Sequence, residues 1–503
     1  MHKEINGMEP TEEQQRVISY TGNRLIVKAR AGTGKTYTLV RFSKARPTQT
    51  ILYLAYNRAL RDEAVRKFPR NGNVLCLTSH QLAYKSLGVL YKHKIADRAS
   101  LTLIHETLAS KSWGLTRDAY STVMAFMASD HDEITEKNFE KYANEPNKTT
   151  LLQTYINQVI EGAKTLWAVM CDVNHPFPCL PDCYLKLYQL SKPDLSRFDW
   201  ILFDESQDAN PPTRAIVACQ RSGLILVGDE HQQIYRFRGA VNAMDAPEFK
   251  DADVLYLTNS FRFGPRVAMV ANAILEFKGE TMPVHGHGAD GNDFVHGFAT
   301  DELTQQHTAY ISRTLMAVIE KSIDLVTQGK RVYWVGGIDA YNIETLLHLH
   351  FLKTEQVHRI KDKKLLAQFK TWDDYVVMAE ESGDSEMLRC IKILGAYPEF
   401  ESLEKHLRAS SVEQEFESHA TVTTAHRSKG LEWETVVMNE DFPDVLDPMM
   451  KKEAQEDELN LLYVVATRAM KHLVINTSVF FLINHVAKLR AQARDLGQMP
   501  ASI

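Results

Sequence analysis

A short segment near the N-terminus combines small residues with a lysine and a threonine. Its sequence, ARAGTGKT at residues 29–36, follows an apolar run and precedes a helical one. It matches the P-loop, except that Ala29 replaces the first glycine. In such a loop backbone N–H groups cradle phosphates, the lysine reaches the outer phosphates and the threonine hydroxyl ligates Mg²⁺. The segment predicts a nucleotide site contributed by Ala31, Gly32, Thr33, Gly34, Lys35 and Thr36, with Thr36 as a metal ligand.

Two adjacent carboxylates follow a second apolar run. Residues 200–208 read WILFDESQD, so Asp204 and Glu205 come directly after the expected strand. A P-loop enzyme needs one carboxylate to hold Mg²⁺ through water and a second to orient or deprotonate the attacking water. We assign the first role to Asp204 and the second to Glu205. A solvated acidic turn is the alternative interpretation, and the P-loop argues against it.

The elements that must position these residues are short runs rich in Val, Ile, Leu and Tyr. Such runs, separated by helical stretches, predict strands buried on both faces in parallel α/β sheets. In the first half they lie at 25–28, 50–56, 73–78, 200–203, 224–227 and 254–257. In the second half they lie at 309–312, 331–335, 421–424, 435–438 and 472–476. We therefore expect an α/β protein with two cores.

Two long intervals lack the strand pattern and show helical spacing of apolar residues. They span residues 85–198 and 340–418, and each lies within a core. The predicted domains are a first core at 1–84 and 199–264 with a helical insertion at 85–198. A second core at 265–339 and 419–503 carries a shorter helical insertion at 340–418.

Composition limits the class of protein without identifying it. The chain has 503 residues, 44% hydrophobic and 24% charged, and a formal net charge of −6. We find no apolar run of roughly 20 residues and no secretory signal, so we expect no membrane association. Six cysteines do not form a disulfide framework, which favours a reducing compartment. We expect a cytoplasmic protein, associated with the nucleoid if the source is prokaryotic or viral.

A third segment carries a family resemblance. Residues 228–240, GDEHQQIYRFRGA, resemble the superfamily 1 helicases of the UvrD/Rep type. Other segments resemble further motifs of that family in the same order, at 11–14, 56–58, 78–81, 260–262, 424–432 and 463–469. Residues 184–193, 231–233 and 460–463 also resemble the F-box DNA helicases. About ten residues precede Thr11, so we expect no F-box and carry over no ubiquitin-ligase role.

The resemblance implies two RecA-like cores with ATP and Mg²⁺ bound between them. Lys35, Glu205 and the γ-phosphate sensor Gln232 would act from the first core, with Arg262 and Arg468 as arginine fingers from the second. The remaining residues implied in nucleotide binding are Gln14 and Phe261 at the adenine, Tyr37 on its opposite face, and Glu432 near the sugar. Relatives have tyrosine and arginine where Phe261 and Tyr37 stand, so the preference for ATP over GTP stays open.

The same resemblance implies a groove for single-stranded DNA. Such binding combines aromatic stacking with contacts to phosphates. The matching residues are Tyr56, Asn57, His80, Tyr235, Phe237, Arg238 and His426. Tyr235 and Phe237 are notable because they lie just after Gln232, so that hydrolysis could change the grip on a base.

We therefore expect an ATP-dependent single-stranded DNA translocase or helicase, working 3′ to 5′ as a monomer. Single-stranded DNA and single-strand/duplex junctions are the expected partners, with a recombinase filament as a further candidate in recombination or repair. The short second insertion leaves duplex unwinding less secure than translocation. A nucleotide-gated DNA clamp and an RNA-directed helicase remain alternatives.

A zinc site and a fused nuclease are disfavoured. Cys171, His175, Cys179 and Cys183 have irregular spacing for zinc, so we interpret them as buried thiols and a loop histidine. Little more than 30 residues follow Arg468, which leaves no room for a nuclease in this chain.

Overall fold

The computed structural model describes residues 9–70, 72–110, 112–139, 153–382 and 385–495, with the backbone alone for Arg238 and for residues 381–382 and 385–386. Contacts group the chain into two units. One comprises Met1–Arg30 and Gly34–Leu257, and the other comprises Ala31–Thr33 and Thr258–Ile503.

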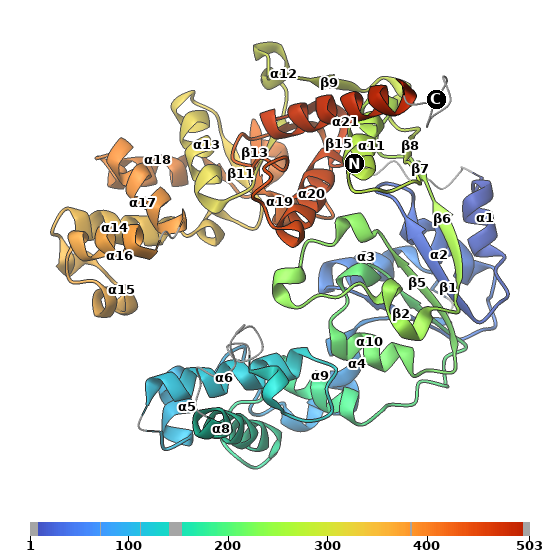
Figure 1. The fold of residues 1–503 in the computed structure, drawn as a ribbon, viewed down its shortest axis with the longest axis horizontal. Coiled ribbons are helices and arrows are strands. Elements are labelled where there is room, and N and C mark those ends of the chain that lie inside the picture. The colour runs from blue at the N-terminus through green and yellow to red at the C-terminus, as the bar shows by residue number, and fades with distance from the viewer. Residues whose placement is uncertain (1–8, 71, 111, 140–152, 383–384, 496–503) are drawn as a thin grey trace. The chain divides into compact units, whose positions relative to one another are not determined.

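The first unit is built on a six-stranded parallel sheet (Figure 1). Its strands are β1 (Arg24–Ala29), β2 (Ile51–Ala55), β3 (Val74–Thr78), β4 (Trp200–Phe203), β5 (Gly223–Gly228) and β6 (Asp253–Leu257), in the order β3-β2-β4-β5-β1-β6. All six were predicted from apolar runs, to within one or two residues at their ends. Because parallel strands end at one edge, the segments that follow them meet there.

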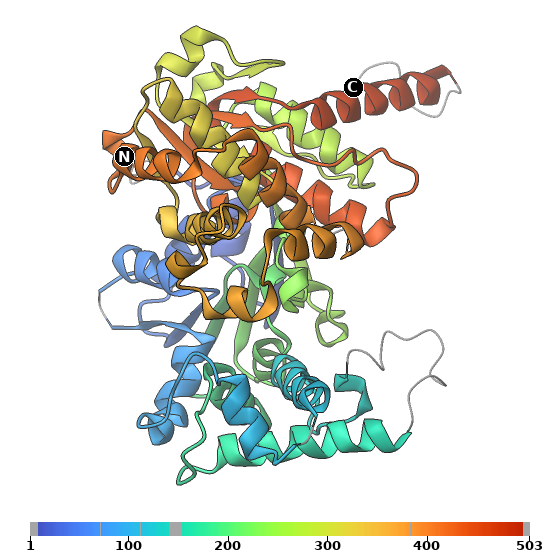
Figure 2. The same cartoon turned by 90° about the vertical axis from the view of Figure 1, so that its left-hand side faces the viewer.

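Helices cover this sheet and extend into the interval between β3 and β4. Those near the strands are α1 (Glu12–Ile18), α2 (Lys35–Lys44), α3 (Arg58–Lys67), α4 (Ser79–Ser86) and α10 (Pro211–Ala218). The interval adds α5 (Leu101–Thr107), α6 (Trp113–Ala128), α8 (Gln153–Cys171) and α9 (Pro181–Leu190). α6 and α8 lie side by side (Figure 1, Figure 2). One apolar cluster runs from sheet residues such as Leu52 to residues such as Val159 on α8, so the sheet and these helices share a core.

The second unit contains a seven-stranded parallel sheet. Its strands are β9 (Phe294–His296), β10 (Thr308–Ser312), β11 (Val332–Trp334), β12 (Ser411–Val412), β13 (Ala420–Thr424), β14 (Trp433–Met438) and β15 (Ala469–Val474), in the order β12-β11-β13-β10-β14-β15-β9. The two edge strands, β9 and β12, were not predicted. They have three and two residues, too few to show a pattern. A separate parallel pair joins β7 (Asn259–Ser260) and β8 (His285–Gly286).

Helices of the second unit pack on the sheet and form a group after β11. They are α11 (Pro265–Phe277), α12 (Asp301–Gln305), α13 (Leu315–Thr327), α14 (Ile343–Lys353), α15 (Lys363–Gln368), α16 (Trp372–Ser382), α17 (Ser385–Ala396), α18 (Phe400–Ser410), α19 (Ala425–Ser428), α20 (Lys452–Ala466) and α21 (Thr477–Asp495). The expected class, α/β with parallel sheets, is confirmed. Among the described helices, none combines the length and apolar character needed to cross a bilayer.

Candidate functional site

The loop between β1 and α2 turns at two glycines with positive φ, Gly32 and Gly34. Gly34 caps α2 with φ of +77°, in the left-handed region that favours glycine. A Cβ at Gly34 would lie 3.0 Å from Nε2 of Gln14. Gln14 is buried, and its Oε1 accepts the backbone N–H of Thr11 at 3.1 Å within a capping box. The structure therefore brings the amide end of Gln14, the expected adenine contact, against the loop.

Lys35 and Glu205 meet at the carboxyl edge of the first sheet. Nζ of Lys35 lies 2.6 Å from Oε1 of Glu205, and both side chains are mostly buried. Burial would lower the pKa of Lys35, but the carboxylates of Glu205, Asp204 and Asp229 outweigh burial and raise it. The ammonium group is thus firmly charged, as a group that binds phosphate oxygens must be.

Asp204 lies in the same buried cluster and has three donors around it. Its Oδ2 accepts from the Tyr53 hydroxyl at 2.7 Å and from Thr36 Oγ1 at 3.4 Å, while its Oδ1 accepts the Glu205 backbone N–H at 2.9 Å. Burial and the neighbouring Glu205 raise the pKa of Asp204. Hydroxyl and carboxylate oxygens are the donors that Mg²⁺ prefers. The predicted metal ligands Thr36 and Asp204 therefore fit that ion.

Gln207 connects the carboxylate segment to the turn after β5. Its Nε2 donates to Oε2 of Glu205 at 2.5 Å, and its Oε1 accepts the Asp229 backbone N–H at 3.1 Å. Gln232 then donates from Nε2 to Oδ2 of Asp229 at 2.7 Å. Glu205, with φ of +52°, adopts a left-handed conformation that is uncommon outside glycine. The predicted residues Glu205 and Gln232 thus belong to one buried hydrogen-bond network.

Sequence reasoning missed the parts played by Gln207 and Tyr53. Gln207 lies two residues after Glu205, within the acidic segment, so its proximity was visible in the sequence. Tyr53 lies inside β2, where an aromatic residue is ordinary and gives no sign of a polar role. Its contact with Asp204 follows from the pairing of β2 with β4.

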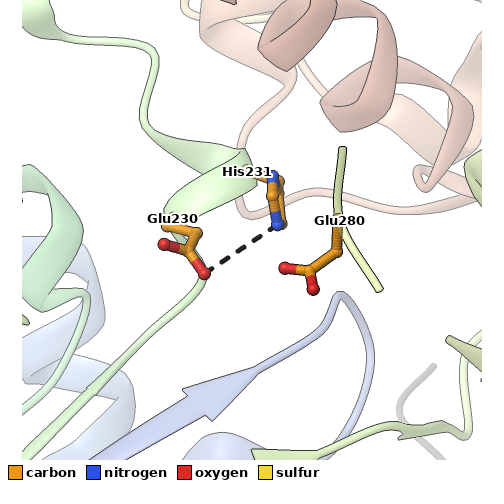
Figure 3. A group of neighbouring side chains, drawn as sticks. All are labelled: Glu230, His231 and Glu280. Carbon is orange, nitrogen blue, oxygen red and sulfur yellow. Dashed lines mark ion pairs between the residues drawn. The ribbon is translucent and has the colours of Figure 1, made fainter. Parts of the chain in front are cut away.

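The turn after β5 also carries a charged group beside Gln232. The Glu230 carboxylate lies 3.1 Å from Nζ of Lys28. It also lies 4.0 Å from Nε2 of His231, the pair joined by the dashed line in Figure 3. Burial would lower the pKa of Lys28, but the charge of Glu230 outweighs burial and raises that pKa. These contacts hold the turn to β1. Glu280, also drawn in Figure 3, belongs to the second unit.

Tyr56 and Tyr235 form a stacked pair. Tyr235 follows Gln233, whose Nε2 donates to the Gln207 carbonyl. The ring centroids of the two tyrosines are 5.6 Å apart with planes at 14°. Phe237 extends the group, with its centroid 6.5 Å from that of Tyr235, and is 67% exposed. Three of the residues expected at nucleic acid are therefore brought together. The Arg238 side chain, also expected there, lies outside the described part of the chain.

Other residues expected at nucleic acid have local partners. The Asn57 side chain caps α3 by accepting the Leu60 backbone N–H at 2.9 Å. Nε2 of His80 lies 2.9 Å from Oδ1 of Asp182 on α9. His426 lies in the short helix α19, at intermediate burial. Their assignments to nucleic acid stay predictions.

In the second unit, Arg262, Glu432 and Arg468 are brought together. Nε of Arg262 lies 2.7 Å from Oε2 of Glu432, and its Nη1 donates to the Thr467 carbonyl at 3.1 Å. Arg468 is buried and donates to the carbonyls of Val464 and Leu431 at 2.9 and 3.1 Å. Two of the residues expected in catalysis are therefore neighbours, and main-chain oxygens hold their guanidinium groups.

The same unit includes the loop residues Ala31–Thr33. Phe261 donates its backbone N–H to the Gly32 carbonyl at 2.9 Å. Gly32 has φ of +75°, and a Cβ there would lie 2.7 Å from Cβ of Arg262. Only glycine permits this approach. Tyr37, on α2 of the first unit, stacks instead under the guanidinium of Arg41, with 5.2 Å to the ring centroid.

Two of the cysteines weighed for zinc are buried, and the histidine has a main-chain partner. Cys179 and Cys183 are buried free thiols, and Nδ1 of His175 accepts the Phe177 backbone N–H at 3.1 Å. Among the described residues, these four do not form a cluster of metal-ligand atoms.

Comparison with known families agrees with the two sheets and the P-loop cluster. The family model described as "UvrD/REP helicase N-terminal domain" matches residues 10–246, and that described as "UvrD-like helicase C-terminal domain" matches residues 419–475. Together they match more than half of the chain. The chain belongs to the UvrD-like helicase family.

Individual relatives agree with this assignment. The chain is 33% identical to "F-box DNA helicase 1" of Gallus gallus, over 94% of this chain and 49% of that protein. It is 29% identical to "F-box DNA helicase protein 1" of Schizosaccharomyces pombe, over 93% of this chain and 57% of that protein. The chain is 24% identical to "ATP-dependent DNA helicase PcrA" of Bacillus subtilis, over 56% of this chain and 41% of that protein. The predicted family resemblance is confirmed, and the chain spans about half the length of these first relatives.

Proposed function

We propose that this chain is an ATP-dependent motor that moves 3′ to 5′ along single-stranded DNA and separates duplex at junctions. Its family membership and the names of its relatives support DNA as the track. Removal of a recombinase filament during recombination or repair, by the chain acting as a monomer, completes the proposal. These finer parts rest on resemblance to the F-box DNA helicases.

The connection from Glu205 to the tyrosine pair carries the proposal. Gln207 contacts Glu205 through its side-chain amide, and its carbonyl accepts from Nε2 of Gln233 at 2.8 Å. Tyr235 follows Gln233 by two residues and stacks on Tyr56. Gln207 thus contacts both the Glu205 carboxylate and the turn that carries Tyr235. A motor needs such a linkage, because hydrolysis must change how a base is held.

The proposed catalytic roles follow from position. Lys35 binds the outer phosphates, Glu205 orients and deprotonates the attacking water, and Gln232 contacts the γ-phosphate. Thr36 and Asp204 would hold Mg²⁺, which would neutralise charge on the phosphates. Arg262 and Arg468 are the proposed arginine fingers.

The nucleotide-binding roles follow in the same way. Gln14 and Phe261 contact the adenine, Tyr37 faces its other side, and Glu432 lies near the sugar. The backbone N–H groups of residues 31–36 surround the phosphates.

ATP turnover with and without single-stranded oligonucleotide tests the enzyme. We expect strong stimulation by DNA, and loss of turnover in both Lys35→Ala and Arg468→Ala. Lys164→Ala, which removes an exposed lysine that pairs with Glu161, is the matched control and should behave as wild type. Turnover that DNA does not change would contradict the motor and favour a nucleotide-gated clamp.

Strand displacement on duplexes with a 3′ or a 5′ tail tests movement and polarity. We expect unwinding only from the 3′ tail and only with ATP. Matched RNA strands serve as competitors, and stronger competition by RNA would make RNA the substrate. Displacement from the 5′ tail alone would overturn the proposed direction.

A further inference from the structure

Two histidines face each other at the outer edge of the second sheet. His296 lies on the edge strand β9 and His472 on its neighbour β15, 176 residues apart in sequence. In the parallel register, His472 pairs with Phe294 and Val474 pairs with His296. Neither histidine belongs to the nucleotide or nucleic-acid residues described above.

The distance between the two rings suits a shared ligand. Nε2 of His296 lies 3.3 Å from Nδ1 of His472. Two nitrogens bound to one tetrahedral ion at about 2.0–2.1 Å each lie roughly 3.3–3.4 Å apart. In the structure the two nitrogens lie within hydrogen-bonding distance of each other. The same separation suits two nitrogens bound to one ion.

Neighbouring rings hold both imidazoles in place. Phe294 and His472 have centroids 5.3 Å apart with planes at 11°, and His296 and His472 have centroids 5.5 Å apart with planes at 29°. The Arg266 guanidinium covers Phe294 at 5.1 Å from its centroid. A stack of this kind fixes the ring orientations in advance, which lowers the entropic cost of binding.

A neutral imidazole offers a nitrogen lone pair to a metal. Both histidines are only half-buried, so an ion and its water ligands can reach them.

We propose that His296 and His472 chelate one divalent transition-metal ion, with water in the remaining positions. Imidazole ligands suit Zn²⁺, Ni²⁺ and Cu²⁺, whereas Mg²⁺ prefers oxygen. The site is therefore separate from the magnesium site at Thr36 and Asp204. By joining β9 to β15, the ion stabilises the edge of the sheet.

Calorimetric titration of the full chain with Ni²⁺ or Zn²⁺, at constant Mg²⁺ and without ATP, tests the site. We expect one ion per chain and a higher melting temperature for the metal-bound protein, because a ligand that binds only the folded state stabilises it. His296→Gln and His472→Gln should each weaken binding by at least about tenfold and remove the temperature shift. His485→Gln, a half-buried histidine on α21, is the matched control and should bind as wild type.

A measurement on the unaltered protein covers the case in which a variant does not fold. Pulsed electron paramagnetic resonance of the Cu²⁺-loaded wild type should count two imidazole ligands. A spectrum with sulfur ligands would assign the ion to the thiols instead. That result, or undiminished binding in both folded variants, would overturn the proposal.

Discussion

Replacing Gln207 with leucine removes the connection between Glu205 and the turn after β5. The side chain is buried and contacts Glu205 at 2.5 Å and the Asp229 N–H at 3.1 Å. A hydrogen bond to a charged group contributes about 1.5–3 kcal/mol. If the contact to Glu205 acts only in the transition state, its loss lowers kcat by roughly 10- to 150-fold, since about 1.4 kcal/mol is tenfold. KM for ATP should change little, because Gln207 does not lie on the P-loop.

Steady-state ATP hydrolysis at saturating single-stranded DNA measures both constants. Gln220→Leu is the matched control, because Gln220 is also buried and also bonds main-chain groups, those of Leu195, Pro193 and Ile216. Both variants leave buried polar groups unpaired at a cost of about 1–3 kcal/mol, so both should have a lower melting temperature than the wild type. Only Gln207→Leu should lose kcat. Equal kcat in a folded Gln207→Leu protein, or an equal loss in the control, would refute the positioning argument.

A second substitution at the same position separates charge from geometry. Gln207→Glu places another carboxylate beside Glu205 and should raise the pKa of Glu205, because like charges disfavour ionisation. A group that must be ionised to act as a base then works only at higher pH. We expect the acidic limb of the kcat profile to move to higher pH, and an unmoved limb would mean that Glu205 does not govern it.

Two further predictions concern the neighbouring residues. Tyr235→Ala should weaken single-stranded DNA binding by about 5- to 150-fold, the equivalent of about 1–3 kcal/mol of base stacking. Tyr235→Phe keeps the aromatic ring and should retain affinity, and a fluorescence-anisotropy titration measures both variants. Equal loss of affinity in both would exclude stacking as the cause. Asp204→Asn should abolish Mg²⁺-dependent turnover yet raise the melting temperature at neutral pH without Mg²⁺, because the raised pKa of Asp204 marks a carboxylate that folding buries at a cost. That gain should shrink as pH falls toward the raised pKa and the wild-type carboxyl takes up a proton, and a constant gain across pH would contradict the assignment.

The sequence was informative where one short segment contains the whole pattern. The P-loop, the carboxylates after β4 and the apolar runs are local, so the eleven predicted strands were found. Asn57 shows a local signal that was overlooked, since asparagine is a common cap and its side chain caps α3. The contact of His80 with Asp182 joins residues 102 positions apart and depends on how α4 packs against α9. Periodicity does not specify such a pairing.

The network around Gln207 explains why the motif residues are spaced as they are. Glu205 takes a left-handed conformation, which places both its backbone N–H and its carboxylate within the buried cluster. Its two carboxylate oxygens then have different partners, Lys35 on Oε1 and Gln207 on Oε2. On the proposed function, a phosphate that draws Lys35 away would change the charge balance at Glu205, whose carboxylate contacts Gln207. Because the Gln207 carbonyl also holds Gln233, two residues before Tyr235, the change would reach the tyrosine pair through two hydrogen bonds.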